Sequence, residues 1–210
     1  MLTFAFEPVT GSIVLLGLWM VGRTHLRPQL TLYGLQTLGL GFLAAWIGIQ
    51  HRETSLIVAG LVVAALKGLV VPLYLGYVIR RIGCRRDAGL LLAPPALLLL
   101  TLSVLAALWL LRPFDEELAR SALPAVGLIL IGMLMMVSRR LAVSQILGFL
   151  VLENGIFLYT VMQPHAMPLV VELGVLLDVL VGTMLAGLLV FRIRDSFEHI
   201  DVTELTQLRG

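Results

Sequence analysis

Long apolar runs, separated by short polar segments, constrain this chain more than any other feature of its sequence. A helix needs about twenty apolar residues to cross the hydrocarbon of a bilayer, and the chain holds about seven such runs. They lie at residues 4–22, 28–49, 55–79, 88–111, 122–137, 141–162 and 168–191. The polarity of these runs does not alternate as it does in barrel strands. With 59% hydrophobic and 13% charged residues, the sequence predicts an all-α, polytopic membrane protein.

The placement of arginine predicts how the chain is oriented in the membrane. Cytoplasmic segments carry an excess of Lys and Arg, and the arginines divide unequally between alternate loops. One side holds Arg23, Arg27, Arg80, Arg81, Arg85, Arg86, Arg139, Arg140, Arg192, Arg194 and Arg209; the other holds Arg52, Arg112 and Arg120. We therefore expect an extracytoplasmic N-terminus and, after an odd number of spans, a cytoplasmic C-terminus. The short turn at Ser138-Arg139-Arg140 predicts an antiparallel helix pair.

Two sites with proline are expected to disturb the helices that contain them. Pro72 follows Val70-Val71 in the third run, where it predicts a kink and a free backbone carbonyl just after Lys67. Pro94-Pro95 predicts a similar disturbance inside the fourth run, with no charge nearby.

Three ionisable residues lie about ten residues from both ends of their apolar runs, near the middle of the bilayer. They are Lys67, which is the only lysine in the sequence, Glu153 and Asp178. A charge at this depth costs about 2.5 to 3.5 kcal/mol on insertion scales, so it is retained when it is paired, hydrated or neutralised. We expect all three side chains to face protein or water.

These charges have two interpretations. Burial favours the neutral forms of acids and amines whereas pairing favours the charged forms, and this competition suits a proton relay. The alternative is a static pair of Lys67 and Glu153 that fixes the order of the helices. Glu172, about 9 Å before Asp178 along the helix axis, either connects that acid with the outer side or complements the helix dipole. Gln36, Asn154, Tyr159 and Thr183 either line a hydrated path or bond across helices, and we favour the second.

Several classes of function are excluded by what the sequence lacks. It has no Gly-rich phosphate loop, no HExxH, no nucleophile elbow and no paired CxxC, so we predict neither a cofactor nor a metal site, and no catalysis by this chain alone. The single cysteine, Cys84, excludes an internal disulfide. With a net charge of only +2, the sequence predicts no basic surface of the kind that binds nucleic acid.

The two ends of the chain show weak internal similarity. A shift of about 111 residues aligns Leu66-Lys67-Gly68 with Leu177-Asp178-Val179 and Arg81 with Arg192, and a similar shift sets Leu35-Gln36 against Leu152-Glu153. The alternative to a degenerate duplication is the chance alignment of Leu-rich helices. A duplication predicts two three-helix units, at 1–87 and 122–195, a linking helix and outer loop at 88–121, and a cytoplasmic tail at 196–210.

Certain motifs are similar to those of known membrane subunits. The stretch from Gly127 to Gly155, with Leu152-Glu153-Asn154-Gly155, resembles the first two helices of the K subunit of respiratory complex I and of the C subunit of multisubunit cation/proton antiporters. The segment from Asp178 to the Leu-Arg-Gly terminus resembles the third helix and ending of those proteins. Over the whole length the chain resembles component E of the hydrogenase-4 and formate hydrogenlyase complexes, also at residues 66–73 and 171–178.

This resemblance implies a function. In K-like subunits two intramembrane acids carry protons between a redox arm and antiporter-like subunits, and by position these acids correspond to Glu153 and Asp178. An Asp stands at the second position where a Glu is usual, and Lys67 belongs only to the component E pattern. The implied partners are antiporter-like and other membrane subunits, lipid and, indirectly, a peripheral hydrogenase arm, in the cytoplasmic membrane of a prokaryote. Two alternatives stay open, namely a structural scaffold with static charge pairs, and a related complex without a hydrogenase.

Overall fold

The computed structural model describes residues 3–82, 86–87, 91–111 and 116–162, which fall in the first of two compact units of the chain, Met1–Gly174. These residues form helices and contain no strand beyond an isolated bridge between His25 and Arg86. The last predicted apolar run at 168–191, with Glu172, Asp178 and Thr183, lies outside the described residues, as does the tail at 196–210.

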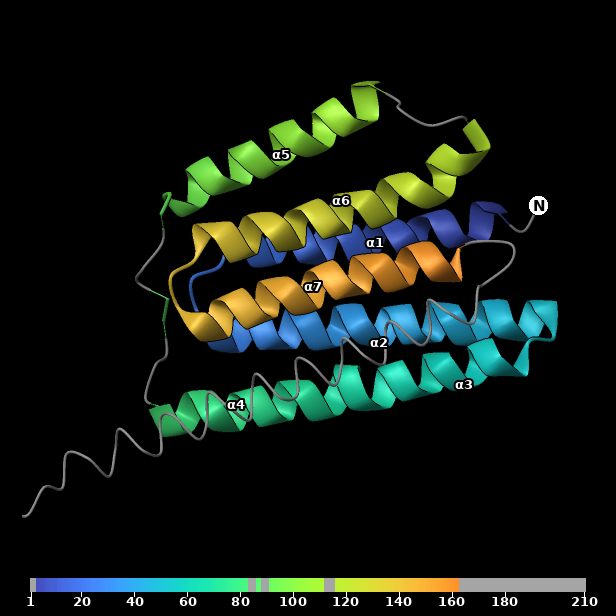
Figure 1. Cartoon of the computed structure of the whole chain (residues 1–210), viewed down its shortest axis with the longest axis horizontal. Helices are drawn as coiled ribbons and strands as arrows, with labels where there is room; N and C mark the ends of the chain where they lie inside the picture. Colours follow the sequence, from blue (N-terminus) through green and yellow to red (C-terminus); the bar gives the residue numbers. More distant parts are fainter. Residues whose placement is uncertain (1–2, 83–85, 88–90, 112–115, 163–210) are drawn as a thin grey trace, which may run out of the picture. The chain divides into compact units, whose positions relative to one another are not determined.

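The helices follow the predicted apolar runs in chain order (Figure 1). They are α1 (Thr3–Val21), α2 (Leu26–His51), α3 (Thr54–Val62), the π-helix η1 (Val63–Val70), α4 (Val71–Ile82), α5 (Pro94–Leu111), α6 (Glu116–Ser138) and α7 (Ala142–Val161). The predicted third run thus corresponds to α3, η1 and α4 in direct succession. Six of the seven predicted runs therefore have a helical counterpart among the described residues.

Two predicted helix boundaries are wrong. The fourth helix begins at Pro94 and not at residue 88, so Pro94-Pro95 starts this helix and does not disturb its middle. Proline suits the first helical position because its missing N–H has no intrahelical partner there, and it holds the preceding residue out of the helical conformation. The fifth helix begins at Glu116, six residues before the predicted start at 122, and contains Pro124 in its interior.

Closely packed helix pairs form the described part of the chain. α6 packs along α7, and α2 packs along α3 and η1 (Figure 1). Glycine permits both approaches, because a Cβ added at Gly41 would lie 2.6 Å from the backbone oxygen of Gly60, and one at Gly132 would lie 2.6 Å from that of Gly148. The antiparallel α6–α7 pair predicted from the short turn is confirmed. α1 and α2 join these pairs, since α1 contacts α2 and α6, and α2 contacts α7.

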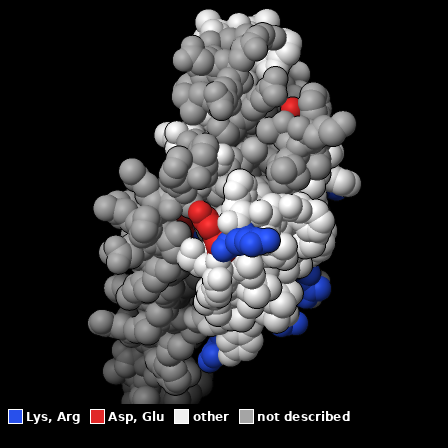
Figure 2. Space-filling model, turned by 90° about the vertical axis from the view of Figure 1, so that its right-hand side faces the viewer, with Lys and Arg blue, Asp and Glu red and all other residues white. Residues whose placement is uncertain are grey.

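Hydropathy and burial together indicate a helical membrane protein. Four stretches are long and apolar enough to cross a bilayer, Leu26–His51, Thr54–Arg81, Pro94–Leu111 and Ala142–Val161. The second and third of these are only 22% and 11% buried, so their apolar side chains face outward over most of their length. Figure 2 shows that Lys, Arg, Asp and Glu form only a few separate groups on the described surface of one face. This surface suits a hydrocarbon surrounding.

Candidate functional site

Lys67 lies in the middle of the third apolar helix, inside the π-helical segment η1. Val71, which follows η1, donates its backbone N–H to the carbonyl oxygen of Leu66, five residues earlier. Pro72 has no N–H to donate to the carbonyl of Gly68, so an α-helix would lose a hydrogen bond at this point in any case. The five-residue hydrogen-bond spacing of η1 lies just before this proline. Lys67 and Gly68 are buried, whereas Leu66 and Leu69 are more than half exposed. The π-helical segment therefore presents the lysine to the interior of the helix bundle.

The partner of Lys67 is the carboxylate of Glu153, midway along α7. The Lys67 Nζ atom lies 2.9 Å from the Glu153 Oε2 atom, and the two side chains are 5% and 3% exposed. Glu153 is predicted from the sequence to be buried, and the static-pair hypothesis joins it to Lys67. The structure confirms that both residues are buried and that they form an ion pair. Two charges that are about 90 residues apart in the sequence thus neutralise each other at mid-helix.

Neutral polar side chains also bond α7 to α2 and α1, beginning at Asn154, the residue that follows Glu153. Asn154 donates hydrogen bonds from its Nδ2 atom to Gln36 Oε1 at 3.3 Å and to Thr37 Oγ1 at 2.8 Å, both on α2. Gln36 in turn donates to the carbonyl oxygen of Ile13 on α1 at 2.9 Å. Gln36, Thr37 and Asn154 are fully buried. The prediction that Gln36 and Asn154 bond across helices is confirmed, and we call these three residues with Lys67 and Glu153 the midplane cluster.

Two residues of this region are missing from the sequence-based prediction. Thr37 gives no signal of its own, because hydroxyl residues are common in membrane helices. Gly17 provides the space for the Gln36 amide, since a Cβ added at Gly17 would lie 3.1 Å from Gln36 Nε2 and 2.9 Å from Leu128 Cδ1. Tyr159, predicted with the polar group, is 39% exposed and lies on an outer face of α7.

A second buried ion pair lies at the helix ends. Arg139, in the turn between α6 and α7, is 1% exposed, and its Nη1 atom lies 3.8 Å from Asp87 Oδ2. Its Nη2 atom donates to three carbonyl oxygens at the end of α1, those of Met20 at 3.3 Å, Val21 at 3.1 Å and Arg23 at 2.9 Å. A cation at a helix C-terminus complements the unpaired carbonyls and the helix dipole. We call Arg139, Asp87 and these carbonyls the arginine clamp.

Burial and the nearby carboxylate of Asp87 act on the charge of Arg139 in opposite directions. Desolvation by burial lowers the pKa of Arg139 from its ordinary value, and the charge of Asp87 opposes that shift. Backbone hydrogen bonds join the surrounding loops, from Asp87 to the carbonyl of Thr24 at 2.9 Å and from Leu91 to that of Ser138 at 2.9 Å. The clamp and these bonds therefore link three loops of the described part of the chain.

The chemistry available to the midplane cluster is proton exchange and hydrogen bonding. Lys and Glu both gain and lose protons in proteins, whereas Arg does not. Within the described ranges, no group of three or more His, Cys, Asp or Glu side chains gathers to form a metal site. Asp178 and Glu172 lie outside these ranges, so their relation to Lys67 stays a prediction.

A multi-pass helical membrane protein with a lysine–glutamate pair at mid-helix is the class that the fold and the site define. Comparison with known proteins identifies the family. An uncharacterized protein of Mycobacterium tuberculosis is 33% identical over 205 residues, which cover 95% of this chain and 93% of that protein. Hydrogenase-4 component E of Escherichia coli K12 is 28% identical over 207 residues, 96% of each chain, and the protein of that name from Shigella flexneri matches equally. The chain belongs to the hydrogenase-4 component E family.

No protein-family model and no solved structure matches the chain. The resemblance to component E, which rests on short motifs, is confirmed over nearly the whole length. The likeness of the C-terminal part to the K subunit of complex I and to the antiporter C subunit stays a prediction.

Proposed function

We propose that this protein is a non-catalytic membrane subunit of an energy-converting nickel-iron hydrogenase, or of a related complex I-like assembly, and that it contributes residues for proton transfer inside the membrane. Its relatives from Escherichia coli and Shigella flexneri are named as components of hydrogenase-4, which supports membership of such an assembly. The observation that carries the proton-transfer part is the buried Lys67–Glu153 pair at mid-helix.

The surroundings of this pair support transfer by a physical argument. An ion pair in a low-dielectric interior responds strongly to any charge that changes nearby, because little solvent screens it. If a partner subunit brings a negative charge near Glu153, the ionised carboxylate is disfavoured, and a proton passes from the Lys67 ammonium to Glu153, which leaves a neutral amine and a neutral carboxylic acid. Asn154, Gln36 and Thr37 are amide and hydroxyl groups, which can reorient to donate or accept at each stage. The pair and its neighbours together provide a switchable polar path across three helices.

Asp178 and Glu172 complete the proposed path. Asp178 corresponds by resemblance to the second acid of K-like subunits, so we assign it the transfer step after Lys67 and Glu153. Glu172 stands six residues before Asp178, which corresponds to about 9 Å along a helix axis, and we assign it the connection of Asp178 with the outer side. The proposed partners are antiporter-like and other membrane subunits, with a peripheral hydrogenase arm acting on this chain through them. We place the N-terminus outside and the C-terminus inside the cytoplasmic membrane of a prokaryote, with the arginine clamp on the inner side.

The direct contact between Lys67 and Glu153 also favours a second function. A buried pair at 2.9 Å is the geometry expected of a static connector, which would make this chain a scaffold between larger subunits. The two functions differ in whether the protonation of Glu153 changes during turnover. They share the membrane location and the membership of a complex.

Proton translocation by the purified complex in sealed vesicles distinguishes the two. We expect Glu153→Gln and Asp178→Asn each to remove most of the translocation while the complex still assembles, because an amide keeps the shape of the acid but carries no proton to exchange. Thr31→Val, at an exposed position of α2, is the control and should translocate normally. Intact translocation in both acid variants would defeat the relay and leave the scaffold.

The identity of the assembly requires a separate experiment. Purification of the tagged full-length chain with its partners should yield a large subunit that carries two CxxC pairs, which are the ligands of a nickel-iron centre. Co-purification of antiporter-like subunits without such a protein would place the chain in a complex I-like or antiporter-type assembly that lacks a hydrogenase.

A further inference from the structure

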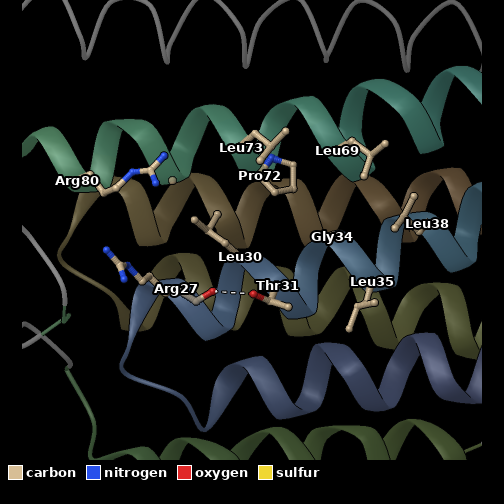
Figure 3. Close-up of a pocket in the computed structure, with 12 residues that line it drawn as sticks. Arg27, Leu30, Thr31, Gly34, Leu35, Leu38, Leu69, Pro72, Leu73 and Arg80 are labelled. Atoms are coloured by element: carbon tan, nitrogen blue, oxygen red, sulfur yellow. Dashed lines mark hydrogen bonds between the residues drawn. The ribbon is translucent and has the colours of Figure 1, made fainter.

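A groove of about 520 Å³ runs between α2 and the η1–α4 segment, apart from the midplane cluster and the arginine clamp (Figure 3). Its floor consists of small or compact residues, Gly34, Gly68, Gly76 and Pro72. A Cβ added at Gly34 would lie 3.1 Å from the backbone oxygen of Gly68 and 3.5 Å from the Pro72 ring. The floor is therefore closed by backbone, and the opening between the leucines above it faces outward.

The two ends of this groove differ in chemistry. Arg27 and Arg80 lie at the same end in Figure 3, on α2 and α4 respectively, while Leu35, Leu38 and Leu69 lie toward the other. Arg27 is the second residue of α2, and Arg80 is in the last turn of α4, so both stand at the level where the helices leave the hydrocarbon. Leu35 and Leu69 are 53% and 51% exposed, at depths that hydrocarbon surrounds.

Neither arginine forms an ion pair with another residue that the structure describes, although both line one recess. Two cations that share a recess at the membrane boundary attract an anion, and an apolar channel that continues from them into the membrane accepts a hydrocarbon chain. An anionic phospholipid has both parts in the same order, with its phosphate at the membrane boundary, where the arginines lie, and its acyl chains deeper, where the leucines lie. A helix from a partner protein would cover the leucines but would need its own acidic residue at this one level.

We propose that this groove is a binding site for one anionic phospholipid, with the phosphate between Arg27 and Arg80 and one acyl chain along Gly76, Pro72, Gly68 and the leucines. The site is independent of the proposed proton transfer, since none of its residues belongs to the midplane cluster. The lipid would fill the recess where α2 and η1 approach, and so support the helix that carries Lys67.

The proposal is tested by native mass spectrometry of the full-length chain, titrated with phosphatidylglycerol or with phosphatidylcholine of identical acyl chains. We expect the chain to retain one phosphatidylglycerol in preference to phosphatidylcholine. Arg27→Gln and Arg80→Gln should each weaken retention of phosphatidylglycerol by about fivefold, the effect of one cation near a charged headgroup. Both arginines are exposed, so these variants should fold.

Arg81→Gln is the matched control, because Arg81 is the exposed neighbour of Arg80, lies outside the groove and bonds to the Tyr77 hydroxyl at 2.9 Å. It should leave retention unchanged. A Cβ at Gly76 would meet only Leu30 Cδ1, at an ordinary 3.8 Å, so the backbone accepts a side chain there. Gly76→Leu should therefore fold and weaken lipid retention by filling the groove. The result that overturns the proposal is equal loss in Arg80→Gln and Arg81→Gln, or unchanged retention in Gly76→Leu.

A photoreactive amino acid in place of Leu73, which is 70% exposed at the mouth of the groove, tests the occupant in the assembled complex. A cross-link to phospholipid supports the proposal. A cross-link to another subunit overturns it and assigns the groove to a protein helix. Displacement of the lipid by inorganic phosphate alone would also overturn it, because the acyl chain would then contribute nothing.

Discussion

The midplane cluster and the arginine clamp are both buried ion pairs, yet they are built from different partners. Lys67 meets a side chain at 2.9 Å, and the polar groups beyond Glu153 are mainly side chains of α2 and α7. Arg139 lies 3.8 Å from Asp87 but donates to three backbone carbonyls at the end of α1. Side chains can turn without unfolding a helix, whereas carbonyls at a helix end cannot. The clamp is therefore suited to holding the fold, and the midplane cluster to changing state.

The first prediction concerns the clamp and has the largest expected effect on stability. Arg139→Met leaves Asp87 and the α1 carbonyls without their cation, and should lower the free energy of unfolding by about 3–5 kcal/mol. Arg140→Met is the control at the adjacent, exposed position and should change it by less than about 0.5 kcal/mol. Denaturant unfolding of the purified chain in detergent measures both. Equal effects of the two substitutions would show that the clamp does not hold the helices.

The second prediction concerns the stability of the midplane pair. Lys67→Met removes the charged partner of Glu153 and should cost about 1–3 kcal/mol. The double variant Lys67→Met with Glu153→Leu removes both charges, so it should unfold at higher denaturant than the single variant. The same unfolding assay decides, and a double variant less stable than Lys67→Met would mean that Glu153 stabilises the fold through groups other than Lys67.

The third prediction addresses the hydrogen bonds from α7 to α2. Asn154→Leu removes both bonds that its amide donates, and interhelical hydrogen bonds in membranes contribute about 0.6 kcal/mol each, so we expect a loss of about 1 kcal/mol. Thermal unfolding of the full chain measures the change. A loss as large as that of Arg139→Met would remove the distinction between the two regions.

The fourth prediction has the smallest effect. Thr37→Val deletes only the hydroxyl that accepts the 2.8 Å bond from Asn154 and should cost about 0.6 kcal/mol. Thr31→Val, which removes an exposed hydroxyl bonded to its own helix at Arg27, is the matched control and should be neutral in the same unfolding measurement. An equal cost at the two threonines would contradict the prediction that the hydrogen bond between Asn154 and Thr37 stabilises the fold.

Several features were predictable because they depend on local sequence. The apolar runs predict α1, α2 and α7 to within two residues at each end, and the scarcity of charge in them marks Lys67 and Glu153 as buried. The π-helical segment depends on more than Pro72, because it forms where backbone from α2 approaches Gly68. Arg139 and Arg140 cannot be told apart from the sequence, because Arg139 is buried through contacts with Asp87 and the α1 carbonyls, which are distant along the chain.

Infrared difference spectroscopy of the purified complex, which compares its spectrum during turnover with its spectrum at rest, tests the proton-transfer account most directly. The account predicts a carboxyl band that changes during turnover in the wild-type complex and is absent in Glu153→Gln, while the control Thr31→Val, at an exposed position of α2, keeps the wild-type spectrum. A carboxyl region that is identical in the wild type and in Glu153→Gln would contradict it, because the glutamate would then keep one protonation state throughout.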